Sequence, residues 1–502
     1  MKYMKKLMAL LAALTLALAM AVPAFAATTT PTTYTITINN GTGTYAAYQI
    51  FKGDLHNNTL SNIEWGDNVT ADGQAALGDA ELKAKSITDE AKAKAFAVEV
   101  ANHLTNTAAG TGTTSIAVSN PGYYLIKNTT VGEGEVFTDY ILQVVKDVEV
   151  NPKSGKPTLN KEIKHNDDGA WGVVGDNQIG DTVEFRTITT VPNVSGYSKY
   201  EYVIHDEMSA GLTSNVKTKG NVTIKVNDTD VLDEGYYDVT VGTANANKFT
   251  VTIDVLQAIK DGKMAAGNNL YTYYTGILNE SAEVYTDGKQ DNKAYLEYSN
   301  NPHDENSKTQ TPNKVVYDWT FKMEVNKIDG ESNAPLSDAK FVLSKNGSCA
   351  LGTIGDDGTP STTTDLINLI KNSDGSYTVA PAGHTGTYVM TAGNITIKGL
   401  DDATEYYLYE TKAPAGYNRL PDAVKFKITA AYDGTGNSCT SVATQVDDNT
   451  AQTGLSITVK NNKGTSLPST GGIGTTLFYV IGGGLMAVAA VLLVTKKRMN
   501  NK

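Results

Sequence analysis

Short stretches in which apolar and polar residues alternate recur along most of this chain. Successive side chains of a strand point to opposite faces, so this period of two predicts strands that are buried on one side. Clear examples are Val222–Val226, Tyr237–Val241, Phe249–Ile253 and Val424–Ile428. Clusters of Gly, Asn and Asp separate these stretches and are typical of turns. The pattern predicts an all-β fold built from tandem β-sandwiches.

One region departs from this pattern. Residues 71–105 are rich in Ala, Lys and Glu, and apolar Phe96, Val100 and Leu104 recur four positions apart. This spacing predicts one or two helices, which we expect to decorate the first domain.

The N-terminus has the three parts of a secretory signal peptide. Lysines at positions 2, 5 and 6 precede an apolar stretch from Leu7 to Val22, and Ala24-Phe25-Ala26 offers a cleavage site. Residues 1–26 are therefore expected to direct export and to be removed.

The C-terminus combines a polar pentapeptide, an apolar run and a basic tail within residues 467–502. The pentapeptide is Leu467, Pro468, Ser469, Thr470 and Gly471, and Lys496-Lys497-Arg498 follows the run. The run spans residues 473–495, about 23 residues, which is enough to cross a bilayer as a helix. Its basic flank is expected on the cytoplasmic side. A plain membrane anchor is one alternative, and a GPI signal, which lacks a charged stop, is another.

Composition limits the partners of the part between these ends. The ends hold seven of the 42 basic residues and none of the 54 acidic ones, so residues 27–471 carry a net charge near −19. Such a body is not expected to bind nucleic acid. At about 100–200 residues per domain, its length predicts three domains. Cys349 and Cys439 both fall in the last domain, where they could form a disulfide or remain two reduced thiols.

Polar stretches that contain proline suggest the domain boundaries. One is Asn151–Pro157 and another is Asn300–Asn313. The expected parts are a first domain at 27–150, a linker at 151–157, a second domain at 158–314 and a third at 318–463.

The second and third domains each direct one lysine inward. Residues i and i+2 of a strand share a face, so Lys161 lies on the face of Leu159 and Ile163. By the same parity, Lys327 continues the apolar face that Trp319 begins. At the other end of each domain, Asn300 continues the face of Leu296 and Tyr298, and Asn461 that of Ile457 and Val459.

These residue types can react with one another. Desolvation lowers the pKa of a buried lysine toward the neutral amine, which can attack the carbon of a carboxamide and release ammonia. A buried carboxyl group could polarise the carbonyl and shuttle the proton. Strand parity selects Glu410 in the third domain, and Asp206 rather than Glu207 in the second. The alternative is a lysine that extends to solvent beside a carboxylate, with asparagine in a turn.

Two motifs carry a resemblance to a known family. The C-terminal segment resembles the cell-wall sorting signal of Gram-positive surface proteins, and Tyr407-Leu-Tyr-Glu410-Thr-Lys-Ala-Pro-Ala-Gly-Tyr417 resembles the E-box of Gram-positive major pilins. The last two domains look like the Ig-like CNA-B modules of that family. The resemblance implies spontaneous isopeptide bonds, Lys161–Asn300 promoted by Asp206 and Lys327–Asn461 promoted by Glu410. It also implies that a sortase cuts between Thr470 and Gly471.

The first domain lacks a matching set. Tyr123-Tyr-Leu-Ile-Lys127 echoes the E-box, but Lys127 occupies the place of the acid. No internal isopeptide bond is expected there.

Lys153 is a candidate acceptor for the sortase-bound Thr470. It lies with Asp147, Glu149 and Asn151 on the polar side of the preceding strand, where Pro152 exposes it. It resembles the lysine of the pilin Tyr-Pro-Lys motif, although Asn151 replaces the tyrosine. Lys156 is the nearest rival, and an ordinary linker lysine is the alternative.

The resemblance implies the backbone subunit of a wall-anchored pilus, with identical subunits, a pilus-specific sortase, a housekeeping sortase, peptidoglycan, minor pilins and host ligands as partners. A monomeric wall-anchored adhesin or minor pilin on the same stalk is the main alternative. No enzyme signature, metal site or cofactor motif is recognised: the six histidines form no H-x-x-x-H pair. The pairs Asp167-Asp168 and Asp356-Asp357 are expected to be turn residues rather than calcium ligands.

Overall fold

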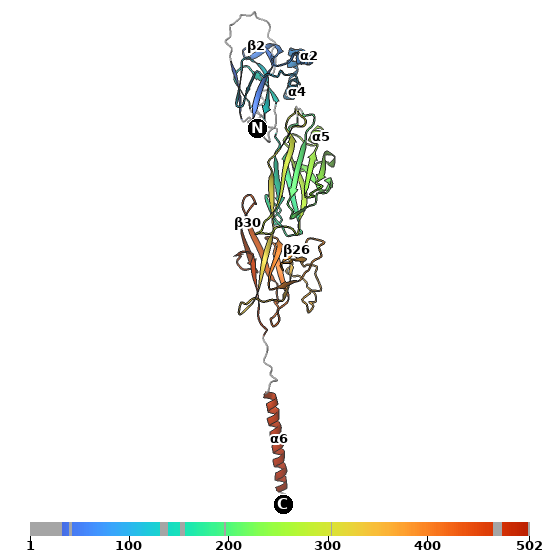
Figure 1. Ribbon diagram of the computed structural model, residues 1–502, viewed down its shortest axis with the longest axis vertical. Coiled ribbons are helices and arrows are strands. Elements are labelled where there is room, and N and C mark those ends of the chain that lie inside the picture. Colours follow the sequence, from blue (N-terminus) through green and yellow to red (C-terminus); the bar gives the residue numbers. More distant parts are fainter. Residues whose placement is uncertain are drawn as a thin grey trace.

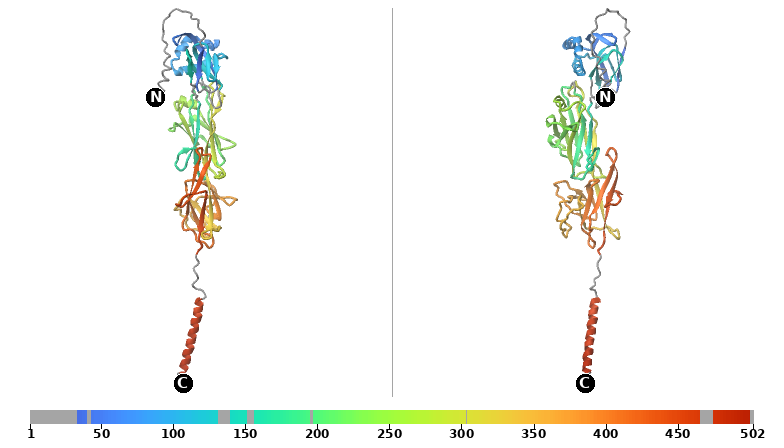
Figure 2. Two further views of the ribbon diagram at one scale, coloured as in Figure 1. Left: turned by 90° about the vertical axis from the view of Figure 1, so that its left-hand side faces the viewer. Right: turned by 180° about the vertical axis from the view of Figure 1, so that it is seen from behind.

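The computed structural model consists of three β domains and a C-terminal helix that follow one another along the long axis (Figures 1 and 2). It describes residues 33–39, 43–130, 139–150, 156–194, 197–302, 304–464 and 474–499. The expected all-β architecture is confirmed. The signal peptide, Lys153 and the pentapeptide 467–471 lie outside the described residues.

The first domain packs a three-stranded sheet, in the order β5-β1-β8, against a sheet in the order β3-β2-β6-β7, with β4 also paired to β2. Its strands are β1 (Tyr34–Ile38), β2 (Thr44–His56), β3 (Thr59–Trp65), β4 (Gly110–Gly112), β5 (Ser115–Val118), β6 (Gly122–Thr130), β7 (Asp139–Val144) and β8 (Val148–Val150).

Three short helices, rather than one or two, decorate this domain: α2 (Ala71–Leu77), α3 (Ala80–Ser86) and α4 (Glu90–Ala101). The division follows from local signals. Gly78, at φ +83°, ends α2, and the Asp79 and Asp89 side chains cap α3 and α4. Phe96 on α4 stacks on Phe51 of β2, with 5.5 Å between ring centroids.

The second domain is a sandwich of two seven-stranded sheets. One has the order β10-β9-β12-β19-β15-β16, with β14 on β19, and the other β11-β22-β20-β13-β18-β17, with β21 on β20. Its elements are β9 (Leu159–Lys164), β10 (Trp171–Gly172), β11 (Val174–Asp176), β12 (Thr182–Thr190), β13 (Tyr202–Met208), β14 (Leu212–Ser214), η1 (Lys219–Asn221), β15 (Thr223–Val226), β16 (Asp230–Val231), η2 (Glu234–Tyr236), β17 (Tyr237–Val241), β18 (Lys248–Ile253), α5 (Val255–Lys260), β19 (Asn269–Leu278), β20 (Gln290–Ser299), β21 (Lys308–Gln310) and β22 (Lys314–Trp319).

The third domain packs a five-stranded sheet, β25-β26-β28-β23-β33, against a six-stranded one, β27-β24-β29-β30-β31-β32. Its strands are β23 (Phe321–Asp329), β24 (Ala339–Ser344), β25 (Leu369–Lys371), β26 (Tyr377–Val379), β27 (Met390–Ala392), β28 (Asn394–Leu400), β29 (Glu405–Lys412), β30 (Val424–Tyr432), β31 (Cys439–Val446), β32 (Gln452–Thr453) and β33 (Ser456–Asn461).

The second and third domains share one continuous core. Strand β22 pairs with β20 and β11 of the second domain, and only Thr320 separates it from β23 of the third. The sheet boundary therefore lies at Thr320, not between residues 314 and 318 as expected. Trp319, at the end of β22, donates its indole N–H to the carbonyl of Gly436 at 3.0 Å.

Helix α6 (Gly474–Met499) stands apart from the β domains (Figure 1). Its Phe478–Met499 segment has 22 residues and a mean hydropathy of 2.2, long and apolar enough to cross a membrane. The described residues of the three hydrophobic cores all lie between residues 34 and 459.

Candidate functional sites

Lys161 lies inside the second sandwich, as its strand parity predicts. Leu159, Lys161 and Ile163 of β9 are buried, while the residues between them are more exposed. A lysine whose side chain is entirely out of water needs polar partners, because an isolated buried charge is costly.

One partner comes from the facing sheet and another from the sheet of Lys161 itself. Lys161 Nζ lies 2.5 Å from Asp206 Oδ2, although β9 and β13 belong to opposite sheets. Lys161 also donates to the hydroxyl of Tyr274, which in turn donates to Asp206 Oδ2. The rings of Phe185 and Tyr274 lie 5.6 and 5.0 Å from the amine. Asp206 lies beside the amine, whereas Glu207 faces outward toward Lys248 and Lys293.

The carboxamide beside this pair belongs to Asn292, not to Asn300. Asn292 is 1 % exposed, and its carboxamide lies close enough to lower the pKa of both Asp206 and Tyr274, against the larger rise that burial causes. Its carboxamide atoms nevertheless have no hydrogen bond of standard geometry among the described residues. On β20, Asn292 lies only two residues from Ala294, the residue paired with Asp206.

The expected pairing of Lys161 with Asn300 is therefore wrong. Asn300 follows the end of β20, six residues from Ala294, or roughly 20 Å along an extended strand. There its Oδ1 accepts a hydrogen bond of 2.7 Å from the Ser307 hydroxyl. The face predicted from parity was right, but the period of two does not say which residue of that face meets the lysine.

Burial changes the protonation of the pair. It lowers the pKa of Lys161 and raises the pKa of Asp206, and the attraction between the two groups opposes both shifts. Although their separation is that of an ion pair, desolvation is the largest effect on each pKa. The pair is thus biased toward a neutral amine beside a protonated carboxyl group. A neutral amine has the lone pair that nucleophilic attack requires.

A second set lies at the centre of the third domain. Strands β23 and β33 pair in parallel, with Lys327 opposite Val459 and Asp329 opposite Asn461. Lys327 is fully buried and donates to the carbonyl of Val459 at 3.2 Å. Burial lowers the pKa of Lys327, and the nearby Glu410 partly opposes this.

Glu410 interacts with both the lysine and the asparagine of this set. Its Oε2 accepts 2.8 Å hydrogen bonds from Asn461 Nδ2 and from the Leu420 N–H. Glu410 Oε1 and Asn461 Oδ1 are buried without a hydrogen-bond partner among the described atoms. The carboxyl group thus lies directly beside the carboxamide nitrogen, the atom that would leave if the lysine attacked.

The E-box residues after Glu410 shape this pocket. Gly416 adopts φ +84°, a conformation that favours glycine, and the Tyr417 hydroxyl then donates to Asp329 Oδ2 at 2.6 Å. The following Asn418 carbonyl accepts from Asn461 Nδ2 at 2.5 Å. The motif therefore positions the carboxamide as well as supplying the acid.

Tyr274 is, after Asn292, a second functional candidate that the sequence reasoning missed. It lies on β19, where alternate residues are buried, and its hydroxyl bridges the amine and the acid. The available signal was a tyrosine on an apolar strand face, because a buried tyrosine hydroxyl needs a polar partner.

The structure describes two of the other candidate lysines, Lys127 and Lys156, but not Lys153. Lys127 is half-buried on β6 and pairs across the sheet with Ala46. Lys156 is half-buried near the start of the second domain. Lys153 falls between β8 and β9, outside the described residues, so its expected role stays a prediction.

The two cysteines are free in the structure. Cys349 lies in the loop after β24, where its N–H donates to the Tyr409 hydroxyl, and Cys439 begins β31 opposite Tyr432. Both thiols are partly buried, and the two cysteines have separate surroundings. Burial raises the pKa of both thiols, which disfavours the reactive thiolate.

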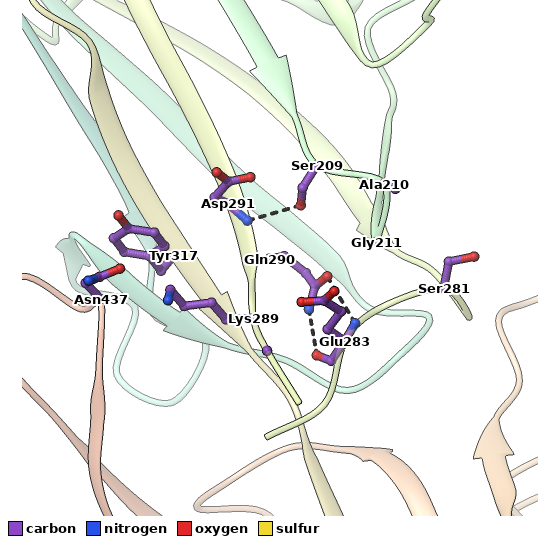
Figure 3. A pocket seen from close by; sticks show the side chains of 11 residues that line it. Ser209, Ala210, Gly211, Ser281, Glu283, Lys289, Gln290, Asp291, Tyr317 and Asn437 are labelled. Carbon is purple, nitrogen blue, oxygen red and sulfur yellow. Dashed lines mark hydrogen bonds between the residues drawn. The ribbon is translucent and has the colours of Figure 1, made fainter. Parts of the chain in front are cut away.

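A groove of about 520 Å³ lies where the second and third domains meet (Figure 3). Several of its polar side chains bond within the second domain: Gln290 bonds the backbone of Glu283, and the Ser209 hydroxyl accepts from the Asp291 N–H. Lys289 lies over the rings of Tyr317 and Trp319, at 4.9 and 5.2 Å. These polar groups are thus satisfied within the second domain.

Comparisons with known proteins agree with this architecture. Residues 321–438 match the SpaA prealbumin-like fold domain, and residues 459–501 match the LPXTG cell wall anchor motif. The trypsin-resistant surface T6 protein of Streptococcus pyogenes serotype M6 is 25 % identical over 415 residues, which cover 69 % of this chain and 70 % of that one.

Two solved pilin structures match this chain, both with TM-scores below 0.5. The T6 backbone pilin of Streptococcus pyogenes has a TM-score of 0.48 at 16 % identity, covering 86 % of this chain and 98 % of that chain. The full-length major pilin SpaD of Corynebacterium diphtheriae has a TM-score of 0.47 at 18 % identity, covering 86 % and 97 %. The anchor motif, followed by an apolar helix, marks a surface protein anchored to the cell wall.

Proposed function

We propose that this protein is the repeating backbone subunit of a covalent surface pilus. Two buried sets of amine, carboxyl and carboxamide groups, one in each of the last two domains, are the observation that carries this proposal. Lysines buried at such cost have a rationale when they react, because the product amide carries no charge. The wall anchor and the similarity to a streptococcal surface protein support the same function.

In the second domain the reacting pair is Lys161 and Asn292. The neutral amine attacks the carboxamide carbon of Asn292, forming a C–N bond as the original C–N bond breaks. The protonated Asp206 donates its proton to the departing nitrogen and receives the proton that the amine loses, so one amide and one ammonia result and the acid is regenerated. The Tyr274 hydroxyl holds the amine and the acid in position.

In the third domain Lys327 and Asn461 react in the same way, with Glu410 as the proton shuttle. The hydrogen bond from Asn461 Nδ2 to Glu410 Oε2 places the acid where the leaving nitrogen needs a proton. Each bond would close a loop of about 130 residues, worth roughly 5 kcal/mol of stability on the chain-entropy model for cross-links.

Polymerisation would join subunits head to tail. A pilus-specific sortase would cut between Thr470 and Gly471 and transfer the Thr470 carbonyl to Lys153 of the next subunit. Such a contact propagates instead of closing on itself. A housekeeping sortase would pass the last subunit to a peptidoglycan amine, and the fibre would support adhesion to a host.

The test is expression in a sortase-positive Gram-positive host, followed by electrophoresis of wall extracts under denaturing conditions. Wild type and Lys156→Ala are expected to give ladders of high mass, whereas Lys153→Ala gives only wall-anchored monomer. Ladders that persist in Lys153→Ala and vanish in Lys156→Ala would move the acceptor to Lys156. Monomer alone in wild type would instead favour a monomeric wall-anchored adhesin.

A further inference from the structure

Three acidic side chains meet where the second and third domains join. We call Asp176, Asp401 and Asp402 the junction carboxylates. Asp176 ends β11 of the second domain, while Asp401 and Asp402 lie in the turn between β28 and β29 of the third. One carboxylate oxygen from each lies within 4.8 Å of the other two, and the residues are only 0, 3 and 5 % exposed.

Asp176 accepts no hydrogen bond of standard geometry from the residues that the structure describes. Both of its carboxylate oxygens are buried without a hydrogen-bond partner among the described atoms. His165 Nε2 comes to 3.1 Å of Oδ2, but without the geometry of a hydrogen bond. Asp401 Oδ1 is also buried without a partner. A fully buried carboxylate that lacks a hydrogen bond and faces two other carboxylates indicates a missing positive charge.

Hydrogen bonds from neighbouring groups hold one oxygen of Asp401 and one of Asp402 in place. Asp401 Oδ2 accepts from the Asn166 side-chain amide at 2.9 Å and from the Thr404 hydroxyl at 3.0 Å. Asp402 Oδ2 accepts from the Ala430 N–H at 3.0 Å and from the Tyr432 hydroxyl at 3.3 Å. Each of these two carboxylates is thus oriented through one oxygen, as metal-binding carboxylates are by their surrounding hydrogen bonds.

We propose that the junction carboxylates bind one calcium ion between the second and third domains. An all-carboxylate set suits a hard divalent cation, and calcium tolerates irregular geometry better than magnesium. His165 and Asp167 form a second group with Asp176, but Asp167 is exposed and the mixed donors suit calcium less well. Calcium sites in extracellular modules commonly have dissociation constants of about 10⁻⁴–10⁻³ M, a range that suits a surface protein.

The electrostatics agree with this geometry. Without an ion, burial and the neighbouring acids raise the pKa of Asp176 to about 12, and burial raises that of Asp401 to about 6. Three bare carboxylates buried so close together are therefore disfavoured, which favours a bound proton or cation. Calcium would replace the protons and connect the two domains through carboxylates from both.

The experiment is calorimetric titration of the chelator-treated ectodomain, residues 27–464, with calcium chloride. This part contains all three hydrophobic cores, so it does not need α6 for its packing. We expect one calcium per chain, weaker binding of magnesium, and a rise in melting temperature with calcium. Asp176→Asn should weaken calcium binding at least tenfold, while Asp357→Asn, in an exposed turn, should bind as wild type does.

Two controls keep the outcome decisive. Circular dichroism establishes that Asp176→Asn is folded, and Asp402→Asn provides a second variant from the other domain. Saturation of one site in wild type together with its loss in both variants supports the proposal. The proposal would be overturned if wild type bound no calcium at concentrations about tenfold above the expected millimolar range. It would also be overturned if both variants bound calcium as tightly as wild type. The site would then consist of carboxyl groups that share protons. Neither result bears on the ladder test, because Lys153 and Thr470 take no part in this site.

Discussion

Lys161 Nζ and Asp206 Oδ2 approach to 2.5 Å across the second sandwich, although their strands belong to opposite sheets. Desolvation biases this pair toward amine and carboxylic acid, the forms needed to attack an amide and to move its proton. The nearby carboxamide of Asn292 completes the set. The following predictions separate this arrangement from a merely structural ion pair.

The mass of the ectodomain should be lower than its sequence mass by two ammonias, each about 17 Da. Asn292→Ala should restore one ammonia, because no carboxamide then remains beside Lys161. Asn300→Ala, which alters the same strand face farther along, should keep the full deficit. Intact mass spectrometry measures both, and a deficit that depends on Asn300 instead would return the assignment to the sequence-based one.

Glu410→Gln should leave the third domain folded but unlinked. Glutamine can still accept from Asn461 and Leu420, yet it cannot carry a proton to the leaving nitrogen. We expect one ammonia more in the mass and a loss of roughly 5 kcal/mol in the free energy of unfolding. Glu405→Gln, on the exposed side near Lys425, should change neither quantity. Full bond formation in Glu410→Gln would contradict the role given to Glu410.

Tyr274→Phe should slow bond formation in the second domain without preventing folding. The variant keeps the ring but loses the hydroxyl that bridges Lys161 and Asp206. Mass spectra of freshly synthesised protein should therefore show an unlinked fraction that decays over time. Tyr273→Phe is the matched control, since that hydroxyl contacts Asp228 and Arg186 outside the core. Equal rates in the two variants would limit Tyr274 to packing.

Asp318 should make the free energy of unfolding fall as pH rises. Burial raises its pKa to about 8, although Asn177 donates a 2.7 Å hydrogen bond to it. Between about pH 4 and pH 8 the unfolded chain loses this proton while the folded chain keeps it, so stability declines by at most about 1.4 kcal/mol per pH unit. Denaturant titrations in EDTA should show a shallower decline for Asp318→Asn. An unchanged slope would mean that Asp318 is already ionised in the folded protein.

The sequence predicted the faces of strands better than the positions along them. Alternation placed Lys161, Lys327, Asp206 and Glu410 inward, and the structure confirms these orientations. It misassigned Asn300 because each residue of one face has the same parity, and only the strand register brings Asn292 to Asp206. In the third domain, the E-box motif that contains Glu410 allowed the surroundings of the acid to be predicted directly from the sequence.

The junction carboxylates could not be predicted from the sequence, for a different reason. Asp176 and Asp401 are separated by more than 200 residues and meet only because two domains pack end to end. No spacing rule for metal ligands covers such a set. The three-helix decoration of the first domain was also only partly predicted, because Asp79 and Asp89 restart helices that a continuous periodicity had merged.

The single residue between β22 and β23 has a consequence for how the molecule responds to pulling. A flexible linker would uncoil first and lengthen at little cost, but Thr320 provides no spare chain between two strands that are each bonded into a sheet. Its own hydroxyl is held by the Leu400 carbonyl at 3.1 Å. These two domains therefore have no slack to take up, and the joint can lengthen only by breaking the hydrogen bonds of a sheet.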